Sequence, residues 1–162
     1  MEKLWAPWRM EYIKNKDKNR GGCVLCLKRL ARGHSEQELV LYRSGLCYVV
    51  LNKYPYIGGH AMVVPNRHIA KLENLTSDEG LDIFLTIQKT IKVLKKAMKP
   101  DGINMGLNLG KAAGAGLTKH LHYHLVPRWN GDTNFMPVIG ESKVISETLK
   151  ASHNRLAPLF KK

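Results

Sequence analysis

The stretch His120-Leu121-His122-Tyr123-His124-Leu125-Val126 alternates imidazoles with bulky apolar side chains. Successive side chains of a β-strand point to opposite faces, so this pattern predicts a strand with three imidazoles on one face. Leu121, Tyr123 and Leu125 should then point into a core. A strand rises roughly 3.3 Å per residue, so successive histidines start about 7 Å apart. Because three of the seven histidines of the chain fall in this stretch, chance is a poor explanation.

Upstream of the histidine stretch, two apolar segments predict a β-hairpin over residues 46–65. Residues 46–51 (Leu-Cys-Tyr-Val-Val-Leu) are typical of a buried strand. Pro55 and Gly58-Gly59 predict a turn, and residues 60–64 a second strand that Pro65 ends. The loop of this hairpin is longer than the two-residue minimum.

A long helix is expected between the hairpin and the histidine stretch. Thr76 and Glu79 have the spacing of a capping box, which predicts a helix start. Apolar residues then recur every three or four positions, with lysines opposite, as in an amphipathic helix that lies on a sheet. These apolar positions are Phe84, Ile87, Ile91, Leu94 and Met98. Pro100-Asp101-Gly102 should end the helix.

The remaining segments complete an α+β layer fold. Residues 103–109 predict a third strand and residues 110–116 a glycine-rich loop. A short helix is expected over 24–31 and a terminal helix over 141–156. We expect residues 1–20, with Trp5 and Trp8, to form an N-terminal arm, and residues 21–162 to form a single domain.

Composition and charge limit the class of protein. The chain has 162 residues with 44% hydrophobic residues, enough for one domain with a proper core. No apolar segment approaches the ~18 residues of a membrane span, and residues 1–10 lack the apolar centre of a signal peptide. We therefore expect a cytoplasmic protein. The net charge of +13 favours phosphate-bearing ligands, of which nucleic acid is one member.

The glycine-rich loop next to the histidine stretch suggests a phosphate site. Gly110, Gly114 and Gly116 leave backbone N–H groups that can turn toward an anion, while Lys111 and Lys119 add positive charge. Such a loop is equally common as a plain tight turn. Imidazole can act as a metal ligand, a base or a nucleophile toward phosphorus. The alternatives for the histidines are a row of structural side chains or three ligands of one catalytic zinc.

The cysteines allow more than one interpretation. Three cysteines without an export signal argue against a disulfide framework. Cys47 lies in an apolar segment and is expected to be a small core residue. Cys23 and Cys26 form a C-x-x-C pair, which can be redox-active, a metal half-site or two buried thiols. The strand-to-helix context of a thioredoxin-like pair is absent.

The motif H-x-H-x-H, flanked by apolar residues, resembles the signature of the histidine triad (HIT) family of nucleotide hydrolases and transferases. The resemblance extends over residues 23–144 and includes Asn52, Gly59-His60, Pro65-x-x-His68, Asn108-Leu109-Gly110 and Pro127-Arg128-Trp129. Residues 4–9 and 129–135 are most similar to the bacterial branch that includes diadenosine tetraphosphate phosphorylases. The family fold implies an antiparallel sheet of about five strands, a long helix, a C-terminal helix and a homodimer formed through the sheet.

The resemblance also implies a mechanism. His122 would attack the α-phosphorus of an adenosine polyphosphate, and water or inorganic phosphate would release the nucleotidyl-histidine. His124 would contact the phosphate and protonate the leaving group. His60 would help to hold the nucleophile side of the site. A backbone carbonyl near the loop 110–116 is expected to fix the tautomer of His122.

The substrate positions follow from the same resemblance. Asn52 matches a ribose-binding position and Asn108 a phosphate-contacting position, while Gly114, Gly116 and Lys119 belong to the expected phosphate loop. Many family members carry Gln or Ser where this chain has Gly116. A backbone N–H or a water would have to replace that side chain, so the choice between phosphorolysis and hydrolysis stays open.

Zinc-bearing family members imply a structural zinc site in this chain. Its four ligands would be Cys23, Cys26, His68 and His120, a closed Cys₂His₂ set. Such an ion would join the arm to the histidine stretch and orient it.

The favoured function is cleavage of dinucleoside polyphosphates, with diadenosine tetraphosphate as the favoured substrate. No membrane partner is expected. One alternative is a hydrolase of nucleoside phosphoramidates or adenylated amines. The other is a non-catalytic, basic, zinc-stabilised module that binds RNA or protein. The binding module predicts RNA binding that weakens with salt and persists in His122→Ala. The enzyme predicts that the same substitution abolishes turnover.

Overall fold

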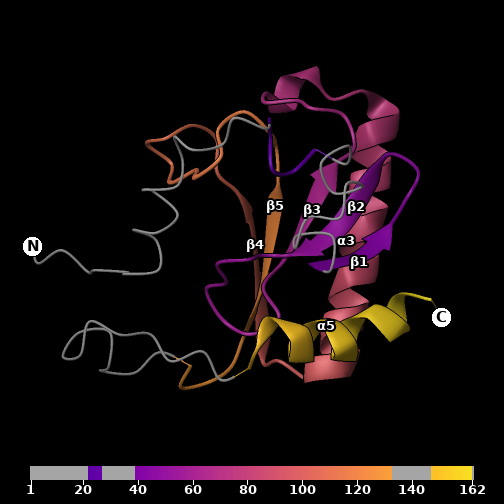
Figure 1. Ribbon diagram of the computed structural model, residues 1–162, viewed down its shortest axis with the longest axis vertical. Helices are drawn as coiled ribbons and strands as arrows, with labels where there is room; N and C mark the ends of the chain where they lie inside the picture. The colour runs from indigo at the N-terminus through magenta and orange to yellow at the C-terminus, as the bar shows by residue number, and fades with distance from the viewer. Residues whose placement is uncertain (1–21, 27–38, 133–146, 162) are drawn as a thin grey trace, which may run out of the picture.

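A computed structural model describes residues 22–26, 39–132 and 147–161 of the chain. In these residues, five strands form one antiparallel sheet in the order β1-β2-β3-β5-β4 (Figure 1). The strands are β1 (Val40–Arg43), β2 (Cys47–Leu51), β3 (Ala61–Pro65), β4 (Gly102–Leu107) and β5 (Tyr123–Arg128). The helices are α3 (Ser77–Met98) and α5 (Leu149–Leu156), with short 3₁₀ turns η3 (Leu72–Asn74) and η4 (Ala157–Phe160). The predicted α+β class is confirmed.

The predicted hairpin is confirmed as β2 and β3. Their antiparallel register runs from Cys47 opposite Pro65 to Leu51 opposite Ala61, and all ten residues are buried. Pro65 is the last residue of β3 instead of lying beyond it. Strand β1 was not predicted from the sequence, although it is apolar over its first three residues. Its four-residue length gives too few alternations for a period-two pattern to stand out.

Helix α3 begins and ends where the sequence predicts. The Thr76 hydroxyl accepts a hydrogen bond from the Glu79 N–H at 3.2 Å, and the Glu79 carboxylate accepts one from the Thr76 N–H at 2.9 Å. These bonds satisfy two N–H groups that a helix start leaves unpaired. At the other end, Lys99 takes a left-handed conformation with φ 48° and stops the helix before Pro100.

The buried face of α3 differs from the predicted one. Phe84 was expected in the core but is 56% exposed. The buried seam instead includes Ile83, Thr86 and Thr90, together with Ile87, Val93 and Leu94. Threonine can lie in this seam because its hydroxyl finds a partner in the helix: Thr90 Oγ1 donates to the Thr86 carbonyl at 2.7 Å. A prediction that counts only apolar residues at helical spacing leaves out these threonines. It therefore assigned the buried face to Phe84 instead of to Ile83, one residue earlier.

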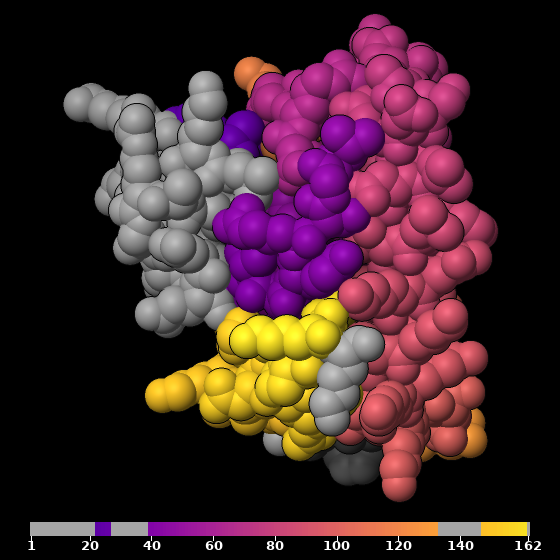
Figure 2. All heavy atoms as spheres, turned by 90° about the vertical axis from the view of Figure 1, so that its right-hand side faces the viewer, coloured from indigo at the N-terminus to yellow at the C-terminus, as the bar shows by residue number. Residues whose placement is uncertain are grey.

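The two faces of the sheet carry different layers. Val49, Val63 and Leu125 face α3 and belong to the main core, which also contains Leu156 and Phe160 from α5 and η4. In Figure 2, α3 covers one side of the molecule and α5 lies below the first strands. The opposite face carries Tyr48, Val50, Met62 and Val64, which pack with Leu25. His124 is paired directly with Met62, so its side chain lies on this second face, away from α3.

The histidine stretch is only partly a strand. Strand β5 begins at Tyr123 and continues to Arg128, whereas His120, Leu121 and His122 precede it. The backbone of that preceding segment is held by a hydrogen bond from the Leu121 N–H to the Ile69 carbonyl at 2.7 Å. This bond goes to a loop instead of to a neighbouring strand, which is why the ladder begins later than predicted.

Other predicted boundaries shift or lie outside the described residues. The arm 1–20 and most of the helix predicted over 24–31 lie outside them, and residues 23–26 form a turn closed by the Cys26 N–H and the Cys23 carbonyl at 3.1 Å. The terminal helix was predicted from residue 141, but α5 begins after Thr148, whose hydroxyl accepts from the Ala151 N–H. In the described part of the chain, every helix is too short or too polar to cross a bilayer.

Candidate active site and metal centre

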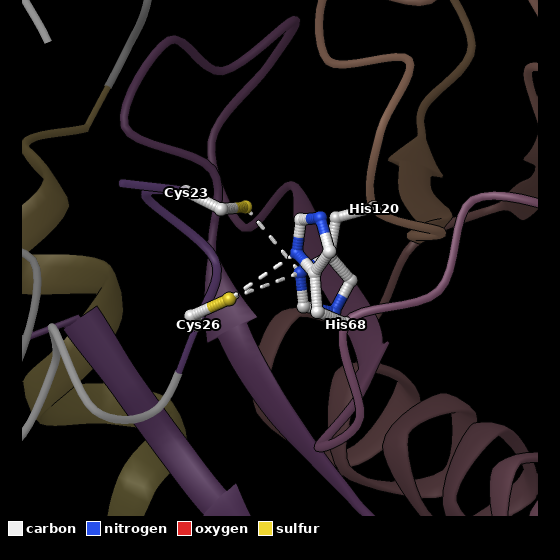
Figure 3. Close-up of side chains that lie close together, drawn as sticks. All are labelled: Cys23, Cys26, His68 and His120. Carbon is white, nitrogen blue, oxygen red and sulfur yellow. Dashed lines mark hydrogen bonds between the residues drawn. The ribbon is translucent and has the colours of Figure 1, made fainter. Parts of the chain in front are cut away.

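Four side chains from three distant segments converge on one point (Figure 3). Cys23 and Cys26 come from the turn at 23–26, His68 from the loop after β3, and His120 from the segment before β5. Their ligand atoms all lie within 4.8 Å of one another. The Cys23 sulfur is 3.4 Å from Nδ1 of His120, and the Cys26 sulfur is 3.3 Å from Nδ1 of His68. The four predicted metal ligands are therefore brought together.

The donor set and its geometry fit a tetrahedral metal ion. Zinc bonds of about 2.3 Å to sulfur and about 2.0 Å to nitrogen place neighbouring donors roughly 3.5 Å apart, close to the observed separations. The His120 ring donates from Nε2 to the Pro65 carbonyl at 2.9 Å. In the neutral ring Nδ1 then carries the lone pair, and Nδ1 is the atom that faces the sulfurs. Burial also lowers the pKa of His120, which favours this neutral ligand form.

Two contacts outside the ligand set hold the cluster in place. The Tyr48 hydroxyl, buried in β2, donates to the Leu25 carbonyl at 2.5 Å and so attaches the C-x-x-C turn to the sheet. Arg67, next to His68, donates to both oxygens of Glu79 at 2.8 and 2.7 Å. The capping box of α3 therefore also positions the loop that carries His68. Neither partner was identified from the sequence, because nothing in their spacing marks them.

His120 also links this cluster to His122. The Nδ1 of His122 donates to the backbone carbonyl of His120 at 2.8 Å. The proton of the neutral His122 ring is thereby held on Nδ1, and Nε2 keeps its lone pair. A carbonyl that fixes this tautomer was predicted near the loop 110–116, and the carbonyl observed is that of His120, two residues before His122. The metal ligand and the orienting carbonyl are therefore one residue.

His60 is in contact with His124. Nε2 of His60 lies 2.9 Å from Nδ1 of His124, while His60 is fully buried at the end of the β2–β3 turn. His60 thus contacts the third triad histidine. The rings of His122 and His124 meet edge to face with centroids 4.9 Å apart. The Tyr56 ring lies tilted against that of His60, with a centroid distance of 4.6 Å.

Burial favours the neutral forms of the His122 and His124 imidazoles. It lowers the pKa of His122, an effect that the hydrogen bond to the His120 carbonyl partly opposes. The pKa of His124 is lowered to about 4, first by burial and then by the neighbouring His122. At neutral pH the site therefore presents two uncharged rings, one with a free Nε2 lone pair.

The predicted substrate residues surround this centre to different degrees. Asn52 lies beside His60, with its Nδ2 3.5 Å from Nδ1 of that ring. Asn108 reaches the glycine-rich loop, since its Nδ2 lies 3.9 Å from where a Cβ of Gly114 would be. Lys119 is exposed, next to the buried His120.

The glycine-rich loop is less open than expected. The N–H of Gly114 donates to the Lys111 carbonyl at 3.0 Å, and the N–H of Ala115 donates to the Gly110 carbonyl at 3.2 Å. These donors close the loop and are not directed at a ligand. Gly110 and Gly114 have φ values of 83° and 87°, so glycine is needed there for the turn.

Known relatives resemble most of the chain. A protein from Mycobacterium tuberculosis strain CDC 1551 / Oshkosh, named AP-4-A phosphorylase, is 42% identical over 162 residues, which covers 97% of this chain and 83% of the relative. A bis(5'-nucleosyl)-tetraphosphatase [asymmetrical] from Schizosaccharomyces pombe is 30% identical over 121 residues, or 75% of this chain and 63% of that protein.

Solved structures share the fold. A Zn-bound histidine triad family protein from Mycobacterium smegmatis superposes with a TM-score of 0.68 at 22% identity, covering 86% of this chain and 96% of that one. The sequence model of the HIT domain matches residues 34–131, more than half of the chain. The chain therefore belongs to the histidine triad family.

Proposed function

We propose that this protein cleaves dinucleoside polyphosphates, with diadenosine tetraphosphate as the favoured substrate, through a nucleotidyl intermediate on His122. The observation that carries the proposal is the 2.8 Å hydrogen bond from Nδ1 of His122 to the His120 carbonyl. It leaves Nε2 as a neutral nucleophile in a buried site. The names of the two curated relatives support the same reaction class.

The reaction would proceed in two displacements. Nε2 of His122 attacks the α-phosphorus, the bond to the bridging oxygen breaks, and the polyphosphate leaves. His124, whose ring contacts that of His122, stands where it can donate to the leaving oxygen. An acceptor then attacks the same phosphorus and frees His122. Dividing one hard displacement into two easier ones is the gain of a covalent route.

The substrate would be held by groups around the two rings. We assign Asn52 to the ribose and Asn108 to the phosphates, together with the loop at Gly114 and Gly116 and the charge of Lys119. The N–H of Gly116 has no hydrogen-bond partner among the described residues, so it remains a donor for an anion. In phosphoryl transfer, donors and charges of this kind do most of the catalytic work.

We further propose that Cys23, Cys26, His68 and His120 hold a structural zinc ion. The support is their mutual geometry and the tautomer of His120. All four ligands come from the protein, which is typical of a closed structural site that leaves no position for substrate. Bound there, the ion would fix the ring of His120 and with it the carbonyl that orients His122. None of the three cysteines forms a disulfide, which also suits the reducing cytoplasm.

A second copy of the chain is the partner that we propose. Strand β4 lies at the edge of the sheet, with β5 as its one neighbour among the described strands. Met105 of β4 is 55% exposed. Edge pairing in a homodimer would cover this side chain and the unpaired backbone groups of β4. Sedimentation velocity should show a dimer that Met105→Lys weakens, and a monomeric wild type would contradict this.

Product analysis tests the proposed reaction. Diadenosine tetraphosphate is incubated with the protein, with and without inorganic phosphate. ADP and ATP that appear only with phosphate would identify a phosphorylase, in which Gly116 does not prevent phosphate use. AMP and ATP in both samples would identify a hydrolase. If neither pair appears, the favoured substrate is wrong.

A further inference from the structure

The backbone N–H of Tyr56 begins a directed chain of hydrogen bonds that ends at the leaving-group side of the site. It lies 3.1 Å from Nδ1 of His60, and Nε2 of His60 lies 2.9 Å from Nδ1 of His124. A backbone N–H can only donate, so Nδ1 of His60 accepts and the proton of that ring is on Nε2. His60 therefore donates to Nδ1 of His124, whose own proton must be on Nε2.

The side chain of Asn52 supports the same direction. Its Oδ1 accepts from the Tyr54 N–H at 2.9 Å, so its amide nitrogen is the atom that faces Nδ1 of His60, at 3.5 Å. That nitrogen is also a donor only. Two donors thus point at one ring nitrogen of His60, and both are incompatible with a proton there.

This arrangement opposes a second proton on His124. An imidazolium at His124 would carry a proton on Nδ1 and would need Nε2 of His60 as its acceptor. The proton of His60 would then have to move to Nδ1, against the N–H of Tyr56 and the amide of Asn52. Protonating His60 as well would place two positive charges at hydrogen-bonding distance in a buried site, which is strongly unfavourable.

The ring of Tyr56 covers His60 and His124 and so strengthens the preference for neutral rings. Its centroid lies 4.6 Å from that of His60 and 5.9 Å from that of His124. Tyr56 is 36% exposed, whereas His60 beneath it is fully buried. Burial of this kind disfavours charge, and the lowered pKa of His124 agrees with it.

We propose that His124 serves the leaving group as a neutral hydrogen-bond donor and that the Tyr56 N–H, acting through His60, holds it in that state. The site therefore prefers leaving groups that depart as stable anions over amines that must be protonated. This inference rests on the proposed function and narrows it to phosphate and polyphosphate leaving groups.

The bond changes balance without a proton transfer. The lone pair on Nε2 of His122 forms the N–P bond, the P–O bond breaks, and its electron pair stays on the departing phosphate oxygen. The Nε2–H of His124 stabilises that charge by a hydrogen bond. An amine leaving group is different: its nitrogen must gain a proton before the P–N bond breaks, and the neutral ring is a poor source.

The state of His124 can be read directly by ¹⁵N NMR of imidazole-labelled, metal-loaded protein at pH 7. The chemical shifts of the ring nitrogens distinguish protonated from unprotonated atoms, and peaks are assigned by single histidine substitutions. We expect Nε2 protonated and Nδ1 unprotonated, both free and with an α,β-methylene analogue of diadenosine tetraphosphate bound. A doubly protonated ring in the complex would overturn the inference.

Substrate preference gives a second readout. Diadenosine tetraphosphate should exceed adenosine 5'-phosphoramidate in kcat/KM by about 100-fold or more, since a proton donor contributes roughly 10²–10⁴ to reactions that need one. His60→Gln and His60→Glu form a matched pair. The Gln amide can still donate to Nδ1 of His124, so the preference should stay within about threefold. The Glu carboxylate accepts a hydrogen bond instead and favours an imidazolium at His124, so the ratio of the two kcat/KM values should fall about tenfold or more.

The outcomes separate this inference from the proposed function. If the tetraphosphate is cleaved but His124 is an imidazolium, or His60→Glu leaves the preference unchanged, the inference is wrong and the function stands. Equal cleavage of both substrates by the wild type also contradicts it. If no dinucleotide is cleaved, the proposed function fails, while the NMR spectrum of the free protein still decides the protonation state.

Discussion

His120 serves two sites with different atoms. Its ring faces the two cysteines through Nδ1, while its carbonyl accepts from Nδ1 of His122. A shift of this residue would therefore disturb both the candidate metal site and the proposed nucleophile, His122. The H-x-H spacing makes this possible, because residues two apart lie on the same side of an extended chain.

The pH dependence follows from the state of His122. In the proposed mechanism Nε2 of His122 must be unprotonated to attack phosphorus, and burial lowers the pKa of this ring below the usual 6.5. We expect kcat/KM to be flat near pH 7 and to fall tenfold per unit at more acidic pH, below the lowered pKa. A pH–rate profile measures this, and an acid limb beginning above pH 6.5 would contradict it.

The lowered pKa of His124 also makes the folding stability depend on pH. Since His124 has a pKa of about 4 in the fold and about 6.5 when unfolded, the unfolded chain binds more protons at acidic pH. The contribution of His124 is fully present above pH 6.5 and is lost as the pH falls toward 4.

At the level of single residues, the sequence predicts which side chains form the site better than it predicts which contacts hold them in place. The triad, the C-x-x-C pair and His68 were identified by spacing and family likeness. The structure brings four of these residues together in a cluster that could hold a metal ion: Cys23, Cys26, His68 and His120. The contacts of Tyr48 with Leu25 and of Tyr56 with His60 were not predictable. They depend on how β2 and its turn fold, and no short-range pattern encodes them.

The turn between β2 and β3 is the element that positions His60. Gly59 precedes this residue with φ 77°, and a Cβ on it would overlap the side chain of Met98 at the end of α3. A methyl group there would require the flexible end of the Met98 side chain to move, so the turn that carries His60 packs against the end of α3.

Gly59→Ala should destabilise the fold by about 1–3 kcal/mol and lower activity more than stability alone explains, because it moves His60. Urea unfolding and kcat/KM measure the two effects. Adding Met98→Ala should recover part of the loss by removing the overlap, while the positive φ keeps the remainder. Equal stability of Gly59→Ala and wild type would contradict the packing described.

Among the elements, helix α3 shows how far periodicity can predict. The capping box set its first turn correctly, since both reciprocal bonds are present. Its buried face was misplaced because Thr86 and Thr90 lie in the seam and Phe84 does not. The beginning of β5 was misplaced for a related reason: the alternation of histidine and apolar residues continues into a segment that is extended without being paired.

Across the whole molecule, one cluster joins segments that are far apart in the chain. The turn at 23–26, the loop with His68 and the segment with His120 meet there, and Leu25 of that turn also packs against the sheet. A metal ion at this point would therefore act on global stability as well as on the active site.

Removal of metal should lower the melting temperature by roughly 10 °C. This follows from a binding contribution of about 4 kcal/mol at a 1,000-fold excess over the dissociation constant, and about 2–4 °C per kcal/mol for a chain of this size. Calorimetry with and without chelator measures it, and added zinc should restore both melting temperature and activity. Cys26→Ser should reproduce the loss, whereas a melting temperature insensitive to chelation would contradict the proposed site.

The overall fold was predictable from the sequence in class and in most elements. The hairpin, the long helix and the antiparallel sheet each have a local signature. The order β1-β2-β3-β5-β4 does not, because it depends on which distant strands pair, and that is decided by the shape of the common core.

The central claim is a covalent nucleotidyl group on His122, and intact-protein mass spectrometry tests it most directly. The metal-loaded protein is mixed with diadenosine tetraphosphate without phosphate, quenched in alkaline denaturant because the P–N bond is acid-labile, and digested to locate the adduct. The account predicts an added AMP group on the peptide that contains His122, absent in His122→Gly and discharged by water or phosphate. Undiminished cleavage by His122→Gly, with no adduct in the wild type, would contradict it.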